Sequence, residues 1–340
     1  MPWRDDTSAV FHQDRTTEEW DFGKENGMSD AIARAEVSMI QIKNILCPID
    51  FFPASLKAYE YALKLAANYN AGVFALHVVS PMVPTAYDFP LNLSEYTGAL
   101  QKNSRLELAK LGKKAEKVHV PFRSDVVIGS VDSEIHKALK KTKADFVVMG
   151  THGLRGFQRW ILGSEADRML RSCPVPLLTM NAAKGARTVP PAIRSILVTT
   201  DFSEGTSEAL KYAFSIAQEC QARITLLHVV DQVTVESSVK SSLPTIDAVR
   251  RQLEKLVPAE ARPWCEVKTR VEVGVPYDTV LKMQKSEKAD LLVMNVHGKG
   301  LIDRALLGST AERVVRAAMC PVLLIPPAAP REKRKASQRK

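Results

Sequence analysis

Short continuous runs of apolar residues alternate along this chain with longer segments of helical period. In the first half the clearest runs are Ile45–Ile49, Val73–Val79, Phe146–Met149 and Leu177–Met180, and Val118–Ile128 contains one more. Apolar runs of this length indicate strands that are buried on both faces, as in a parallel sheet covered by helices.

Three segments between these runs have the spacing of amphipathic helices. In Ser55–Tyr69 the apolar residues share one face, Ser130–Lys141 begins with residues typical of an N-cap, and Ser164–Arg171 has the pattern of a last helix. Strands and helices therefore alternate. This order predicts an α/β domain with a doubly wound sheet of about five parallel strands and right-handed crossovers.

The whole pattern occurs twice. Ile45–Phe51 returns 151 residues later as Ile196–Phe202, and Ala144–Met149 returns 145 residues later as Ala289–Met294. The change of six residues must lie in the variable stretch between the second and third strands. The chain therefore contains two copies of one fold.

The repeat divides the chain into five segments. We expect a first domain at 42–181 and a second at 193–326, joined by a small, polar, proline-containing linker at 182–192. Residues 1–41 and 327–340 show little apolar periodicity, so we expect a mobile N-terminal extension and a basic C-terminal tail.

Composition and charge narrow the class of protein. Hydrophobic residues make up 45% and charged residues 25%, which is typical of a soluble globular protein. We expect a cytoplasmic location and no membrane partner, because neither a membrane-spanning run nor the pattern of a signal peptide occurs.

The net charge of +9 can attract phosphate ligands, but no known nucleic-acid-binding motif supports a nucleic acid as partner. The five scattered cysteines indicate buried free thiols.

The candidate chemistry lies after the fourth strand of the first unit. In open parallel sheets ligands bind beyond the carboxyl ends of the strands, where the strand order reverses. There the chain reads Gly150-Thr-His-Gly153, then nine residues, then Gly163-Ser164 at a helix start. Such glycines and a helix N-terminus suit an anion, although the glycines can also serve only tight turns. No GxxxxGK[ST] loop and no GxGxxG fingerprint after the first strand occurs.

These motifs resemble the ATP-binding class of universal stress proteins. The resemblance rests on Gly150-x2-Gly153-x9-Gly163-Ser164, on Pro48-x-Asp50 closing the first strand, and on Leu76-His77-Val78 in the second strand. It covers nearly 280 of the 340 residues in two copies. It implies two tandem doubly wound five-stranded parallel-sheet domains of the adenine nucleotide alpha hydrolase-like, Rossmann-like class.

The resemblance also implies roles for single residues of the first unit. Pro48 and Asp50 would lie near the adenine and ribose, Val78 would offer its backbone to the adenine, and Met149 with Gly150 would line the nucleoside. Phosphates of ATP, bridged by Mg²⁺ or Mn²⁺, would be bound by Gly153, Gly163 and Ser164.

The second unit is a degenerate copy of this pattern. Asn295 stands in place of the first glycine, and Thr199 in place of Pro48. Asn tolerates positive φ, so we expect the turn to persist while the side chain crowds the ribose. Nucleotide binding by this unit is left open, and the residues that match the first unit are Asp201, Val229, Gly298, Gly308 and Ser309.

Several neighbouring side chains have alternative roles. Asp50 can cap the first helix, meet a ribose, or do both. His77 and His228 are interpreted as oriented core or rim histidines, and His152 and His297 as loop residues. Four cations can either neutralise phosphate or be solvated, namely Arg155, Arg159, Lys299 and Arg304.

The favoured hypothesis is a universal stress response protein that binds ATP and acts as a nucleotide-responsive signalling module. No acid–base pair stands out, so we assign no catalytic residue and expect slow hydrolysis at most.

The alternative is a structural or chaperone-like interaction protein that does not depend on nucleotide. Family members commonly pair through their last strands, here Pro176–Met180 and Pro321–Ile325, so the chain could form an intramolecular pseudo-dimer or a homodimer. The protein partner is unknown, and an adenylating or electron-transfer enzyme would need a further domain or a flavin site.

Overall fold

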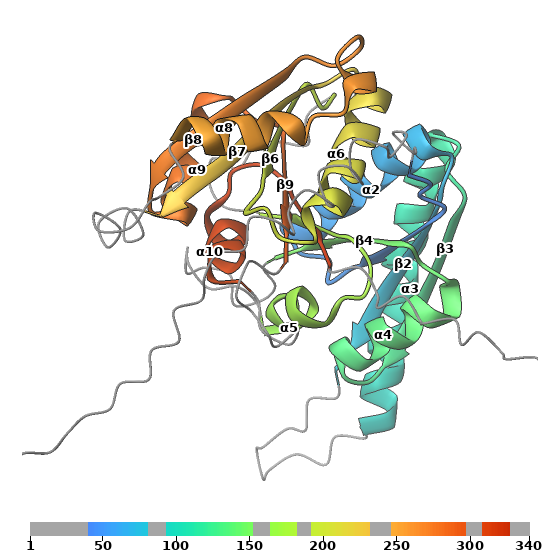
Figure 1. Cartoon of the computed structure of the whole chain (residues 1–340). Coiled ribbons are helices and arrows are strands. Elements are labelled where there is room, and N and C mark those ends of the chain that lie inside the picture. Colours follow the sequence, from blue (N-terminus) through green and yellow to red (C-terminus); the bar gives the residue numbers. More distant parts are fainter. Residues whose placement is uncertain are drawn as a thin grey trace, which may run out of the picture.

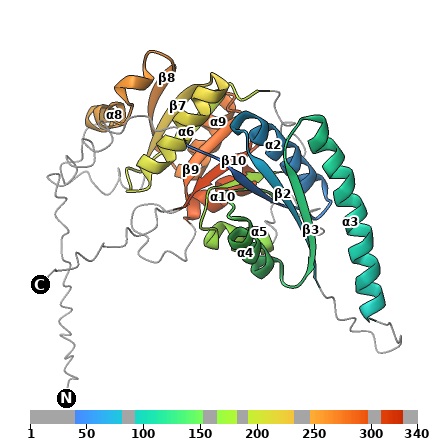
Figure 2. The same cartoon turned by 90° about the vertical axis from the view of Figure 1, so that its right-hand side faces the viewer.

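The computed structural model describes residues 40–80, 93–151, 164–181, 192–231, 246–296 and 308–326. Ten strands in these segments form one continuous sheet in the order β3-β2-β1-β4-β5-β10-β9-β6-β7-β8. Figures 1 and 2 show helices covering both faces of this sheet. We call the elements from β1 to β5 unit 1 and those from β6 to β10 unit 2. The predicted C-terminal tail and nearly all of the N-terminal extension and of the linker lie outside the described residues.

Unit 1 alternates strands and helices as the apolar pattern predicts. In chain order it consists of β1 (Asn44–Pro48), α2 (Pro53–Tyr69), β2 (Gly72–Val79), α3 (Leu93–Lys117), β3 (Phe122–Ile128), α4 (Val131–Thr142), β4 (Phe146–Gly150), α5 (Ser164–Ser172) and β5 (Leu177–Met180). The predicted strands and the three predicted helices are confirmed to within a few residues. The long helix α3 was missed.

Unit 2 repeats the order. It consists of β6 (Ser195–Thr199), α6 (Thr206–Cys220), β7 (Arg223–Asp231), α8 (Ile246–Lys255), the short 3₁₀ helix η1 (Ala259–Ala261), β8 (Val267–Gly274), α9 (Pro276–Ser286), β9 (Leu291–Asn295), α10 (Ser309–Ala317) and β10 (Val322–Ile325). The difference of six residues between the copies falls between β2 and β3, where α3 has 25 residues and α8 has 10.

Each unit is a parallel sheet with the strand order 3-2-1-4-5, which is the order of a doubly wound nucleotide-binding fold. The predicted fold class is therefore confirmed. Strand residues alternate between two cores: Ile45 and Cys47 join the core under α2, α3, α6 and α8, whereas Leu46 joins the core under α4, α5, α9 and α10. Burial on both faces explains why the strands are apolar at every position.

The two units join through their last strands. β5 and β10 pair antiparallel, with Leu178 opposite Leu323, and the Thr179 hydroxyl donates to the Val322 carbonyl at 3.2 Å. This pairing confirms the intramolecular arrangement that the last strands suggested. Because the pair is antiparallel, the carboxyl ends of the strands lie at opposite edges of the sheet in the two units.

A repeated aspartate fixes the start of the first strand in each unit. The Asp145 carboxylate accepts the backbone N–H groups of Lys43 and Asn44 at 3.0–3.2 Å. In unit 2 the Asp290 carboxylate accepts those of Arg194 and Ser195 at 3.0 and 3.1 Å. These two aspartates belong to the repeat, but only the structure shows that they tie β1 to β4 and β6 to β9.

The five cysteines are all free thiols. Cys47, Cys265 and Cys320 are buried as expected, whereas Cys173 and Cys220 are half-buried. Burial raises the pKa of the Cys47 thiol far above its ordinary value, and it raises that of Cys173 to about 12. Such thiols stay protonated near neutral pH and are poor nucleophiles.

Candidate functional site

The carboxyl ends of β1, β2 and β4 meet at one edge of unit 1, which we call the carboxyl edge. β1 lies between β2 and β4, so the strand order reverses there. Pro48 ends β1 opposite Leu76, Val78 lies two residues further along β2, and Met149 and Gly150 end β4. The structure thus brings together the five residues predicted for the nucleoside, with Asp50 just beyond β1.

A strained turn follows β1 and is repeated after β6. Phe51 has φ = 65° and Phe202 has φ = 60°, in the left-handed region that bulky residues avoid. Such a conformation costs about 1–3 kcal/mol and tends to be kept at functional sites. The repeat shows the Asp-Phe pair in both units, as Asp50-Phe51 and Asp201-Phe202. The sequence does not predict that the backbone of the Phe residue is strained.

The aspartate side chain braces this turn. The Asp50 carboxylate accepts the Phe52 N–H at 2.9 Å and a short hydrogen bond from the buried Ser55 hydroxyl. Asp201 accepts the Ser203 N–H at 3.0 Å in the same way. The N-cap of α2 is Phe52, so Asp50 stabilises the turn rather than capping the helix. Asp50 is also exposed at the carboxyl edge, which leaves it accessible to a ligand.

The two histidines at the ends of the second strands hold the same turn. The Nδ1–H of His77 donates to the Ile49 carbonyl at 2.7 Å, and that of His228 donates to the Thr200 carbonyl at 2.8 Å. Their rings lie 4.7 and 4.5 Å from those of Phe51 and Phe202. The interpretation as oriented rim histidines is confirmed.

Glycine is required at position 150 by close approach rather than by φ. A Cβ on Gly150 would lie 2.7 Å from the carbonyl carbon of Ala54 and 2.7 Å from the backbone nitrogen of Ser55. Both are backbone atoms of the first turn of α2, which cannot move aside easily. Gly150 is not among the residues with positive φ. The end of β4 therefore leaves bare backbone against the start of α2.

Unit 2 has the same close contact, but here the glycine lies at the helix start instead of at the strand end. Asn295 occupies the position of Gly150, and the helix residue that it faces is Gly205, where unit 1 has Ala54. In the orientation that satisfies both ends of the amide, Asn295 Nδ2 donates to the Gly205 carbonyl at 3.0 Å, and Oδ1 accepts the Thr206 N–H at 3.2 Å. Asn295 is not among the residues with positive φ, so the tolerance of Asn for that region is not used here.

The predicted phosphate loop lies mostly outside the described residues. This holds for Gly153, Gly163 and Gly298, and also for His152, His297 and the four loop cations Arg155, Arg159, Lys299 and Arg304. Ser164 begins α5. In unit 2 Gly308 is the N-cap of α10, its N–H donates to the Val296 carbonyl at 3.0 Å, and Ser309 is exposed. Val229 lies in β7 in the position of Val78.

The described part of the chain lacks two further features. No group of three or more His, Cys, Asp or Glu side chains there could hold a metal ion. No helix there is long and apolar enough to span a membrane.

The model of the Universal stress protein family matches residues 41–180 and again residues 192–326. The chain belongs to this family. A universal stress protein of Mycolicibacterium smegmatis is 26% identical over an alignment of 297 residues, and the match covers 83% of this chain and 97% of the relative. The family membership inferred from the glycine motif is confirmed.

A solved structure that spans both units agrees on the fold. This structure, of a universal stress protein from Archaeoglobus fulgidus, covers 84% of this chain and 96% of its own, with a TM-score of 0.65 and 22% identity. A universal stress protein solved in complex with cAMP is 27% identical, covers 39% of this chain and 97% of its own, and has a TM-score of 0.31.

Proposed function

We propose that this universal stress protein binds ATP at the carboxyl edge of unit 1 and acts as a nucleotide-responsive signalling module. The supporting observation is the bare contact between Gly150 and the first turn of α2, beside the exposed carboxylate of Asp50. The nucleoside would lie on Pro48, Asp50, Val78, Met149 and Gly150. Gly153, Gly163 and the start of α5 at Ser164 would bind the phosphates. The cytoplasmic location stays a prediction.

The residues at this edge suit a nucleotide better than a protein-held metal. The Asp50 carboxylate and the bare backbone of Gly150 can meet ribose hydroxyls, and the N-terminus of α5 favours phosphate. Mg²⁺ or Mn²⁺ would arrive with the nucleotide and neutralise its phosphates. Hydrolysis is expected to be slow, because we assign no general base.

Unit 2 is proposed to bind nucleotide weakly or not at all. The Asn295 amide already bonds to the Gly205 carbonyl and the Thr206 N–H, so a ligand would have to displace it. Asp201, Val229, Gly298, Gly308 and Ser309 would form the site that remains. A full-length protein should therefore take up one equivalent of ATP.

Calorimetric titration with ATP and Mg²⁺ tests the proposal directly. We expect one site in the wild-type protein and none after the exchange Gly150→Asn with Ala54→Gly. That exchange copies the contact of unit 2, so the variant should keep its fold. Gly163→Val tests the phosphate loop separately.

The outcomes separate three cases. Two equal sites would contradict the assignment of unit 2, and one site that survives the exchange would contradict the assignment to unit 1. No ATP binding would reject the nucleotide module. The same titration with cAMP asks whether this chain shares the ligand of its solved relative.

One observation favours the alternative function, a structural or chaperone-like interaction protein. Unit 2 is joined to unit 1 by the β5–β10 ladder and by contacts such as that between the Tyr69 hydroxyl and Ser215 Oγ at 3.5 Å. Unit 2 thereby occupies the edge strand that a second copy would otherwise pair with. A protein partner whose binding survives the exchange at Gly150 would support this alternative.

A further inference from the structure

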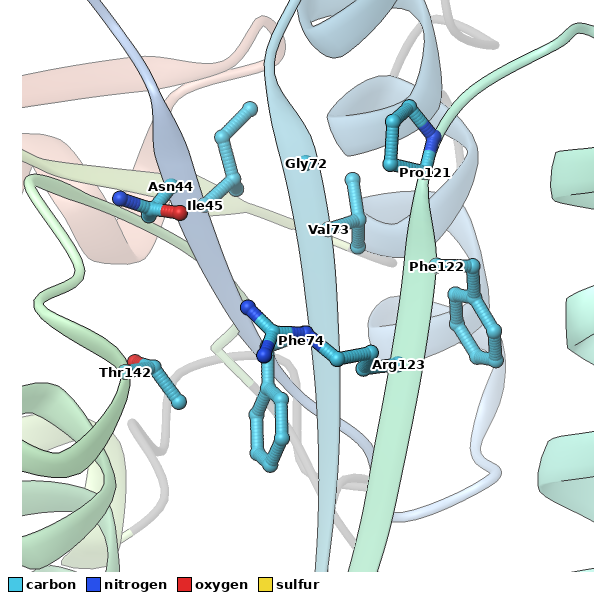
Figure 3. A pocket seen from close by; sticks show the side chains of 9 residues that line it. All are labelled: Asn44, Ile45, Gly72, Val73, Phe74, Pro121, Phe122, Arg123 and Thr142. Carbon is cyan, nitrogen blue, oxygen red and sulfur yellow. The ribbon is translucent and has the colours of Figure 1, made fainter.

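A cavity of about 410 Å³ lies at the amino ends of β1, β2 and β3, beside the end of α4. Strands in unit 1 are parallel, so this edge is opposite to the carboxyl edge. Its size is within the range of small-molecule sites. The residues that line it include Asn44, Gly72, Phe74, Pro121, Arg123 and Thr142, all of which are labelled in Figure 3.

The cavity exists because β2 begins with glycine. A Cβ on Gly72 would have its nearest neighbour, the Pro121 carbonyl oxygen, at 3.7 Å, so a side chain would fit there. Unit 2 has such a side chain, because Arg223 occupies the matching register position beside Ser195. Its guanidinium donates to the Glu287 carbonyl at the end of α9 at 3.4 Å. Unit 1 leaves this volume empty.

The guanidinium of Arg123 stands at the rim of this cavity. Arg123 is paired in register with Phe74, and Figure 3 shows its side chain extending across β2 toward Asn44, on the same side of the strand as the Phe74 ring. Arg123 is exposed and has no hydrogen-bond or ion-pair partner in the described part of the chain. The carboxylate two residues along, Asp125, is paired with Lys141 at 3.4 Å.

The corresponding cation of unit 2 has an acidic partner. Lys268 matches Arg123 and pairs with Glu266 at 3.2 Å. The residue of unit 1 that matches Glu266 is Pro121, which carries no charge. Two differences between the units, at Pro121 and at Gly72, therefore remove the carboxylate from the cation and clear the space next to it.

We propose that this cavity binds a small organic anion with a flat ring. The carboxylate or phosphate of the ligand would pair with the planar fork of Arg123, which suits such groups. The ring would lie against Phe74 and the bare backbone of Gly72. Asn44 and Thr142 line the same cavity, and the Thr142 hydroxyl already donates to the Ala138 carbonyl at 2.8 Å. The net charge of +9 favours the approach of anions.

Titration of the full-length protein with benzoate and with phenyl phosphate tests the site, using ligand-observed NMR and calorimetry. We expect both anions to bind and uncharged benzamide to bind at least about tenfold more weakly. Arg123→Gln should weaken benzoate binding about tenfold. Gly72→Leu should abolish it, because the added side chain fills the cavity without a backbone clash.

Lys268→Gln is the matched control, since it removes the corresponding cation of unit 2. It should leave benzoate binding unchanged, and all three variants should keep the ATP binding of the wild type because the cavity lies at the opposite edge of unit 1. Equal benzoate affinity in wild type and Arg123→Gln would overturn the proposal. So would the failure of both anions to bind at millimolar concentration.

Discussion

Each unit contains the same close contact between the end of its fourth strand and the start of its first helix. The two units place the side chain in this contact on opposite partners. In unit 1 the strand contributes Gly150 and the helix contributes Ala54, whereas in unit 2 the strand contributes Asn295 and the helix contributes Gly205. The approach of strand to helix is too close for side chains on both partners. In unit 1 the side chain is on the helix, so the strand end at the carboxyl edge is bare. In unit 2 it is on the strand, and its amide bonds to the helix start.

The largest expected effect comes from adding a side chain to the bare contact. Gly150→Ala should destabilise the protein by about 1–3 kcal/mol, because its Cβ would lie 2.7 Å from two backbone atoms of α2. Urea denaturation measures the change. Asn295→Ala should cost less, about 1 kcal/mol, since it removes hydrogen bonds without a clash. An equal cost for the two variants would show that the contact does not differ between the units.

A second experiment asks whether unit 2 can be converted. Asn295→Gly with Gly205→Ala transfers the contact of unit 1 and removes two amide hydrogen bonds, so it should cost about 1–2 kcal/mol. If the amide alone keeps nucleotide out, calorimetry with ATP and Mg²⁺ should detect a second site. An unchanged stoichiometry in a folded variant would mean that Thr199 or the loop of unit 2 also prevents binding.

The smallest effect concerns the interface between the units. Tyr61 and Tyr212 occupy matching positions of α2 and α6, but the Tyr61 hydroxyl is buried without a partner in the described residues. Burial raises the pKa of Tyr61 far above its ordinary value and that of Tyr212 to about 12. Tyr61→Phe should therefore stabilise the protein by about 1 kcal/mol, and Tyr212→Phe by no more than about 0.5 kcal/mol.

Thermal unfolding at pH 7 and at alkaline pH measures both tyrosine variants. Because the folded-state pKa values are raised, the stability that depends on neutral tyrosines is complete below about pH 10 and falls as the pH rises toward 12. Tyr212→Phe should reduce that alkaline loss. A destabilised Tyr61→Phe variant would show that this hydroxyl has a partner.

Much of the fold could be predicted because its signals are local. Apolar runs such as Ile45–Ile49 and the 151-residue repeat fix the strands and their number without any knowledge of contacts. Helix α3 was not predicted because its residues are polar on average, so no clear apolar face marks it in the sequence. The candidate site was found through the glycine motif and the family resemblance, which carry no information about distances.

What the sequence by itself determined is the succession of strands and helices, the existence of two copies, and the family of the chain. Only the tertiary structure decided why Gly150 is glycine, because the atoms that exclude its Cβ lie about a hundred residues earlier in the chain. It also decided that β5 pairs with β10 within the chain, where the sequence left a homodimer equally open, and that Gly72 lines a cavity at the position where unit 2 has Arg223. Each of these depends on residues that are distant in sequence and in contact in space, so no local pattern could reveal it.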